Sequence, residues 1–168
     1  YIAQIRAWFY YMSVLSAILF DDIPFENVVT TGTVLAEDGE KMSKSKNNFP
    51  DPLIIINKYG VDSLRFYLMG SPVMNAENFN FSEKGVEEIY KKVILMLYNV
   101  TNFYELYNGI EANKKINSKN IMDKWIISRT NNLIKETDLS LKKYDTIETC
   151  NKIRIFIDEL STWYVRRS

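Results

Sequence analysis

Three long stretches of this sequence carry apolar residues at the spacing of an amphipathic helix, and no other feature constrains the fold as strongly. The stretches cover residues 82–107, 121–143 and 147–166. Residues 108–120 are rich in Asn, Lys and Gly and are predicted to form a linker between the first two helices. Helices with one apolar face bury that face against each other, so the C-terminal half is predicted to be a helical bundle.

The N-terminal part mixes helical and β-type patterns. Residues 1–20 keep helical spacing and are predicted to form a buried helix that ends at Asp21 to Pro24. Residues 27–31 are mostly β-branched and predict a short strand closed by Gly32.

A hairpin-like segment is predicted after this strand. Residues 33–35 lead into the dipeptide Asp38-Gly39, which is typical of a tight turn. Residues 40–48 are polar and lack periodicity, so they are predicted to form an exposed loop.

Two shorter helices are predicted over residues 51–59 and 61–69, the first capped by Asp51 with Pro52 at its first position. Residues 73–82 show no period and are predicted to be a connector. The predicted fold class is therefore mostly α with a small α/β portion, in which the edge of an α/β layer is followed by the helical bundle.

The composition is that of an ordinary globular protein, with 46% hydrophobic and 25% charged residues in 168. By sequence, no stretch approaches the roughly 20 uninterrupted apolar residues of a membrane span. There is neither a Met start nor a signal segment, and we expect both ends to be cut rather than finished. The chain has no His, which excludes His-based catalysis and ligation, and its only Cys, Cys150, cannot form an internal disulfide.

The net charge of zero is unevenly distributed along the chain. Residues 1–110 carry nine Lys/Arg and thirteen Asp/Glu, whereas residues 111–168 carry twelve and eight. A basic C-terminal section suits a phosphate-backbone partner, and a solvated helical surface gives the same excess.

The polar loop holds the strongest chemical signal. Lys41, Lys44 and Lys46 lie within six residues, with Ser43 and Ser45 between them and no acid. Ammonium and hydroxyl groups donate hydrogen bonds to charged oxygens, which matches a polyphosphate. Lysines that close on departing pyrophosphate would stabilise its charge mainly in the transition state. A solvated loop with incidental lysines is the other interpretation.

The order of the residues in this loop resembles a known family. Lys41-Met42-Ser43-Lys44-Ser45 resembles, without a mismatch, the signature loop of class I aminoacyl-tRNA synthetases. The flanks at 31–39 and 48–52, and the later blocks at 59–65, 71–78 and 163–168, resemble the same family in the same order. Residues 71–78 and 163–168, with the block Gln4 to Tyr10, most resemble the isoleucyl branch. In this block and directly before it, Ala3, Ile5 and Ala7 depart from the family pattern.

The resemblance implies a domain organisation and an activity. Residues 1–80 would be the C-terminal edge of a Rossmann-like catalytic domain, and residues 81–168 an incomplete helical anticodon-binding domain. The family activates an amino acid, here isoleucine, with ATP and Mg²⁺ and transfers it to tRNA.

The resemblance also implies site residues. Lys41 and Lys44 would be catalytic, stabilising the triphosphate and pyrophosphate. Gln4 and Trp8 would line the amino-acid pocket. The other ATP-binding candidates are Val34, Leu35, Met42, Ser43 and Ser45. The candidates for binding tRNA are Lys114, Lys115, Arg129, Lys142, Lys143, Arg166 and Arg167.

The resemblance implies partners and a location as well. The family's other ATP motif contains His, so the remainder of a synthetase chain would be a partner, and we expect these 168 residues alone to be inactive. A cytoplasmic location is expected, with no membrane partner and no protein-bound metal in this segment. The alternatives are a valyl, leucyl or methionyl enzyme, a standalone tRNA- or RNA-binding helical module, and a helical interaction domain.

Overall fold

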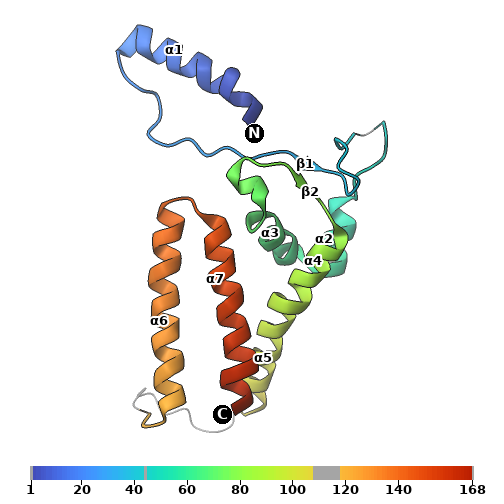
Figure 1. The fold of residues 1–168 in the computed structure, drawn as a ribbon, viewed down its shortest axis with the longest axis vertical. Coiled ribbons are helices and arrows are strands. Elements are labelled where there is room, and N and C mark those ends of the chain that lie inside the picture. Colours follow the sequence, from blue (N-terminus) through green and yellow to red (C-terminus); the bar gives the residue numbers. More distant parts are fainter. Residues whose placement is uncertain (1, 44, 108–117, 168) are drawn as a thin grey trace. The chain divides into compact units, whose positions relative to one another are not determined.

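The chain folds into two compact units in a computed structural model, which describes residues 2–43, 45–107 and 118–167 (Figure 1). The N-terminal unit comprises Tyr1–Phe49 and Ser71–Phe81, and the helical unit comprises Pro50–Gly70 and Ser82–Ser168. Each unit is therefore built from two separate stretches of sequence.

The N-terminal unit begins with a 3-10 helix, η1 (Ile2–Arg6), and an α-helix, α1 (Trp8–Phe20). This confirms the predicted helix, but the expectation that it is buried is wrong. Ser16 is the one buried residue of α1, and Phe20 is 75% exposed. The apolar residues of α1 surround the helix instead of forming one stripe. Phe25 meets Phe9 edge to face, but a contact of this size covers little of the helix.

The segment Ile2–Phe20 is also long and apolar enough to cross a membrane, with 19 residues and a mean hydropathy of 1.2. The expectation concerned an uninterrupted apolar run, and Gln4, Arg6, Ser13 and Ser16 interrupt this segment. The mean hydropathy tolerates these polar residues. Length and composition do not separate a membrane span from a helix that the core of a soluble protein covers, so this is weak support for a membrane role.

A two-stranded parallel sheet joins the two stretches of the N-terminal unit. β1 (Val34–Leu35) pairs with β2 (Phe79–Asn80), with Val34 opposite Phe79. The predicted strand at residues 27–31 is wrong, because that segment has no ladder partner and β1 lies a few residues later. The segment at residues 73–82, predicted to be a connector, instead contains β2 and most of a 3-10 helix, η2 (Pro72–Asn75).

Gly32 brings the two stretches of the N-terminal unit together. Its N–H donates to the Val73 carbonyl at 2.7 Å, and a Cβ added at Gly32 would lie 1.8 Å from the Glu77 carbonyl oxygen. Only glycine permits this approach of two backbones. The small core beside it contains Ala36, Val73 and Phe81.

The helical unit starts with α2 (Pro52–Tyr59) and α3 (Val61–Met69), both as predicted. The Asp51 carboxylate accepts the Leu53 N–H at 2.9 Å and caps α2, with Pro at the first position. Gly60 then separates the helices with a φ of 82°, a left-handed value that glycine adopts readily.

The long helix predicted at residues 82–107 is confirmed as three consecutive segments. They are α4 (Glu83–Ile89), a π-helical turn η3 (Tyr90–Ile94) and α5 (Leu95–Leu106). α4 packs on α2 and α3, and η3 packs on α3. Ile55, Ser63, Val86 and Val93 of these elements are the largest fully buried side chains among the described residues.

The last two predicted helices form an antiparallel pair, α6 (Ile121–Lys142) and α7 (Thr146–Asp158), which π-helical η4 (Glu159–Val165) extends (Figure 1). Asn120 and Asp145 cap them through their side chains. The predicted linker falls largely on residues 108–117, which lie outside the described residues. The predicted class, mostly α with a small α/β portion, is confirmed.

Candidate functional site

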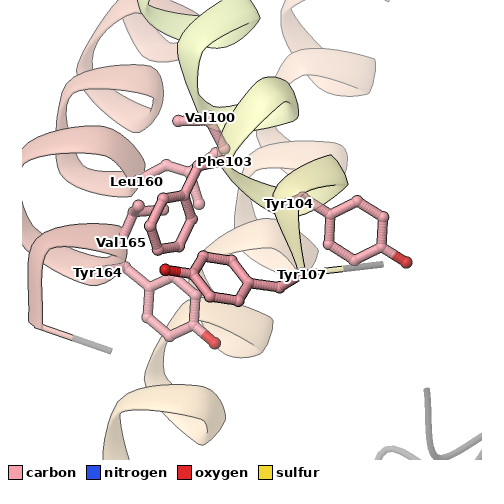
Figure 2. Close-up of a pocket in the computed structure, with 7 residues that line it drawn as sticks. All are labelled: Val100, Phe103, Tyr104, Tyr107, Leu160, Tyr164 and Val165. Atoms are coloured by element: carbon pink, nitrogen blue, oxygen red, sulfur yellow. The ribbon is translucent and has the colours of Figure 1, made fainter. Parts of the chain in front are cut away.

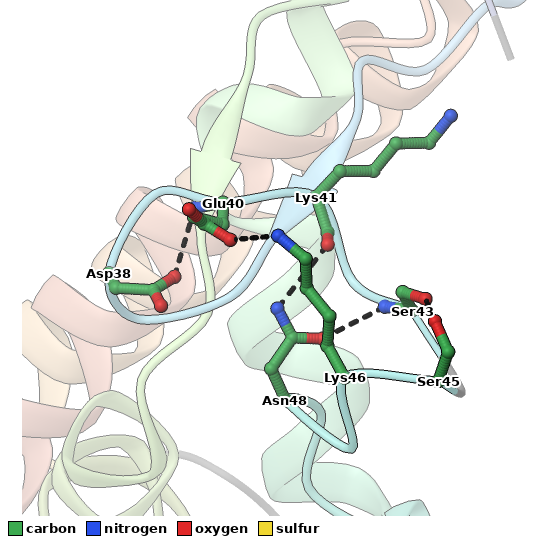
Figure 3. Close-up of polar contacts among 7 residues, drawn as sticks. All are labelled: Asp38, Glu40, Lys41, Ser43, Ser45, Lys46 and Asn48. Atoms are coloured by element: carbon green, nitrogen blue, oxygen red, sulfur yellow. Dashed lines mark hydrogen bonds and ion pairs between the residues drawn. The ribbon is translucent and has the colours of Figure 1, made fainter.

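The lysine-rich loop leaves β1 through a tight turn, as the Asp38-Gly39 dipeptide predicts (Figure 3). The Ala36 N–H donates to the Glu40 carbonyl at 2.9 Å, and Leu35 bridges Lys41 in antiparallel fashion. Gly39 has a φ of 82°, and the Asp38 carboxylate accepts the Glu40 N–H at 2.9 Å. The turn therefore fixes the point at which Lys41 leaves the sheet.

The side chain of Asn48 closes the far side of the loop. Its oxygen accepts the Ser43 N–H at 2.8 Å, and its nitrogen donates to the Lys41 carbonyl at 3.3 Å (Figure 3). The hydroxyls of Ser43 and Ser45 lie 2.8 Å apart, within hydrogen-bonding distance. One amide thus binds backbone groups on both sides of Met42.

The lysines of the loop differ in their partners. Lys46 forms an ion pair with Glu40, whose hydrogen bond and charge raise the pKa of the Lys46 ammonium. Lys41 extends away from Glu40 and Asn48 (Figure 3), and within residues 2–43, 45–107 and 118–167 it forms no ion pair. Lys44, predicted to be catalytic, lies outside the described residues.

An open hollow of about 620 Å³ lies beside this loop. Two lysines and a serine are among its lining residues, and Glu40 is already paired with Lys46. The lining residues are Glu40, Lys41, Met42, Ser43 and Lys46. Ammonium and hydroxyl donors beside an open hollow suit a phosphate-rich ligand.

The other predicted ATP-binding residues lie on the strand that leads into the loop. The Leu35 carbonyl accepts the Phe81 N–H at 2.9 Å, so the ladder uses this group. The backbone groups of successive residues in a strand point to opposite sides, so the N–H and C=O of Val34 point away from β2.

The predicted amino-acid pocket residues lie at the junction of η1 and α1. Gln4 belongs to η1, and its carbonyl accepts the Ala7 N–H at 3.2 Å. Trp8 begins α1 with 62% of its surface exposed. Among the described residues, no hydrogen bond or ring contact joins either side chain to the lysine loop.

The predicted tRNA-binding cations that the structure describes lie on α6 and at the ends of α6 and η4. Arg129 of α6 pairs with Glu159 of η4 at 2.8 Å, with both side chains about two-thirds buried. Lys142 pairs with Asp138 at 2.7 Å. The Arg167 guanidinium lies over the Trp163 ring, 3.9 Å from its centroid. Lys143 and Arg166 follow the ends of α6 and η4. Lys114 and Lys115 lie outside the described residues.

A second hollow, of about 590 Å³, lies between α5 and η4 (Figure 2). The rings of Phe103, Tyr107 and Tyr164 gather around it, and the Tyr164 hydroxyl donates to the Asp123 carboxylate at 2.9 Å. The full lining is Val100, Phe103, Tyr104, Tyr107, Leu160, Tyr164 and Val165. Sequence reasoning placed the residues from α5 on an apolar stripe, and only the folded bundle brings them to η4.

No metal centre forms among the residues that the structure describes, because no three His, Cys, Asp or Glu side chains are placed to hold an ion. Cys150 is a half-buried residue of α7, and burial raises the pKa of its thiol. The sequence analysis did not predict that Glu40 pairs with Lys46 or that Asn48 binds the loop backbone. The available clue was that these two polar residues flank the run of lysines.

The chain belongs to the family of class I tRNA synthetases. Residues 2–80 match tRNA synthetases class I (I, L, M and V), and residues 123–168 match the anticodon-binding domain of tRNA ligases.

Within this family, the chain is similar to isoleucine–tRNA ligases over nearly its whole length. It is 44% identical over 170 residues to that of Chlamydia abortus, and 40% identical over 172 residues to the cytoplasmic one of Saccharomyces cerevisiae. These alignments cover 98% and 97% of this chain, but the chain spans only 16% of each relative.

A solved structure shares the fold. It is the LeuRS of Agrobacterium radiobacter in a ternary complex with tRNA and LeuAMS, with a TM-score of 0.73 and 20% identity. The likeness covers 94% of this chain and 21% of that one. It agrees with the expected Rossmann-like edge followed by helices.

Proposed function

We propose that this chain is the part of an isoleucine–tRNA ligase that carries the ATP loop and the first tRNA-binding helices. The observation that carries the proposal is 44% identity to an isoleucine–tRNA ligase over 98% of the chain, with the lysine–serine loop intact. The whole enzyme would join isoleucine to ATP, giving isoleucyl-adenylate and pyrophosphate, and then transfer the isoleucyl group to tRNA.

In the first reaction, an isoleucine carboxylate oxygen bonds to the α-phosphorus of ATP as the bond to the β-phosphate oxygen breaks. Negative charge grows on the departing pyrophosphate, and Lys41 and Lys44 would stabilise it as catalytic residues. The ammonium of Lys41, which forms no ion pair with the described residues, lies at an open hollow and supports this role. Met42, Ser43 and Ser45 would contact the nucleotide through backbone groups or hydroxyls. Mg²⁺ would arrive bound to the phosphates of ATP and would neutralise part of their charge. The loop offers cations, hydroxyls and amides, which bind the phosphates and not the metal.

Two further groups of residues would bind the small substrates. Val34 and Leu35 would flank the adenine, and the outward backbone of Val34 supports its part in this. Gln4 and Trp8 would line the isoleucine pocket, and the exposed Trp8 ring is available for that contact.

The helical unit would hold tRNA. We propose residues 1–80 as the catalytic part and residues 81–168 as the incomplete anticodon-binding part, although α2 and α3 pack with the later helices. Lys143, Arg166 and Arg167 are the better phosphate-contact candidates, because Glu159 already neutralises Arg129. The remainder of the synthetase chain would be the other partner, and the location would be cytoplasmic.

The test is pyrophosphate exchange by the full-length gene product that contains this chain, with isoleucine, valine, leucine and methionine offered separately. We expect a preference for isoleucine. Lys44→Ala and Lys41→Ala should each lower kcat by roughly 10²-fold, the cost of losing one oxyanion-stabilising group. Lys135→Ala, which removes an exposed cation from α6, is the matched control.

The alternatives give different outcomes. Exchange with valine, leucine or methionine would keep the family and replace the substrate. No exchange by the folded full-length protein would leave a non-catalytic tRNA-binding module. The 168-residue chain alone should show no exchange, because the rest of the catalytic domain is missing.

A further inference from the structure

Asn48 holds the backbone of the lysine loop at two points. Its side chain accepts from the Ser43 N–H at 2.8 Å and donates to the Lys41 carbonyl at 3.3 Å. These bonds reach back five and seven residues along the chain. An amide offers an acceptor and a donor on separate atoms, whereas an ionised carboxylate of the same size can only accept.

The residue before Asn48 sets its direction. Asn47 has a φ of 47°, in the left-handed region that asparagine tolerates better than most residues. Asn47 lies in a turn, and the Asn48 side chain after it reaches back to Lys41 and Ser43, as Figure 3 shows. The loop is thus closed by local geometry at both borders, the Asp38-Gly39 turn and the Asn47-Asn48 pair.

Lys41 and Lys46 differ in what holds them. Lys46 is held by Glu40, on the turn side of the loop. Lys41, whose carbonyl Asn48 fixes, sends its ammonium away from both anchors and lines the hollow with Met42. The backbone that carries Lys41 is therefore fixed before any ligand binds, while its side chain stays available.

We propose that Asn48 is a positioning residue for adenylate formation: it fixes the loop backbone from Lys41 to Ser43 so that the Lys41 ammonium meets the departing pyrophosphate. This rests on the proposed function. The role is exerted through Lys41, since Asn48 binds backbone groups and does not line the hollow. Pre-organised donors contribute most in the transition state, so the effect belongs in kcat and not in the KM for ATP.

The experiment is pyrophosphate exchange by the full-length protein with Asn48→Ala, Asn48→Asp and a control, Asn131→Ala on the exposed side of α6. Loss of both hydrogen bonds should lower kcat about tenfold with little change in the KM for ATP. Asn48→Asp keeps the acceptor for Ser43 and should fall between wild type and Asn48→Ala. The control should match wild type.

A double-mutant cycle separates positioning from a merely structural role. If Asn48 acts through Lys41, then Asn48→Ala should cost far less activity in a Lys41→Ala background than in wild type. Wild-type kcat in the folded Asn48→Ala variant, or equal losses in both backgrounds, would overturn the proposal. An inactive wild type would instead remove the proposed function, and this inference with it. Unchanged far-UV circular dichroism of each variant guards against misfolding.

Discussion

Replacing Ile55 by Ala should destabilise the helical unit strongly, whereas the same change at the neighbouring Ile54 should not. Both residues lie on α2, but Ile55 is 1% exposed and Ile54 is 63% exposed. The pair therefore keeps the helix and the chemical change constant and varies only burial.

The magnitude follows from the atoms removed. Ile→Ala deletes three carbons, worth about 2.4 kcal/mol at about 0.8 kcal/mol per buried methylene. The cavity left by the deleted carbons raises the cost at Ile55 to about 3–4 kcal/mol. At Ile54, only about a third of this burial is lost, and the higher helix propensity of Ala offsets part of it, leaving roughly 0.5 kcal/mol.

The assay is urea unfolding of the 168-residue chain, followed by tryptophan fluorescence in a Trp8→Phe background. Trp125 and Trp163 then report on the helical unit alone. With an m-value of about 2 kcal/mol/M, Ile55→Ala should lower the midpoint by roughly 1.5–2 M, and Ile54→Ala by about 0.3 M. Equal shifts for the two variants would refute the packing of α2 described above.

Two further predictions concern charged groups. Hydrogen bonds from Lys58 and Tyr59 lower the pKa of Glu83 below its ordinary 4.5, so the folded state binds this proton less tightly than the unfolded state. The stabilisation is present above that value and is lost as the pH falls through the lower folded pKa, so Glu83→Gln should flatten the acid limb of a stability–pH curve measured from pH 7 to 3. The partly buried pair of Arg129 and Glu159 should show a coupling energy of about 1 kcal/mol in an unfolding double-mutant cycle with Arg129→Met and Glu159→Gln. A steep acid limb that survives Glu83→Gln, or additive losses in the cycle, would contradict these expectations.

The helices were predictable because their signals are local. The apolar spacing of residues 121–143 and the Asp51-Pro52 start each depend on neighbours within one or two turns, and the structure has both within a residue. The burial of residues 1–20 was not predictable in the same way, because burial depends on what covers a helix and not on the helix itself.

The strands show the limit of pattern reasoning. Residues 27–31 have the β-branched composition of a strand, but a strand forms only where another segment offers a ladder. Val34 finds that ladder at Phe79, 45 positions later, and nothing in the sequence between them encodes the register.

The loop was predictable in its cations and not in their arrangement. Lys41 and Lys46 look alike in sequence, yet only Lys46 of the two forms an ion pair, with Glu40, among the residues that the structure describes. Asn48 is one polar residue among several there, and only the left-handed turn before it gives its amide two backbone partners.

The crossing of the chain between its two units bears on how the protein can be divided. A cut after residue 80 respects the sequence families, but it leaves Ile55 and Ser63 on one piece and Val86 and Val93 on the other. Each piece would then expose half of one interior, and two such pieces expressed together would be suited to reassemble without a peptide bond. The boundary between the two units therefore does not fall at one point in the sequence. In a split reporter divided after residue 80, packing of the shared core would hold the two pieces together.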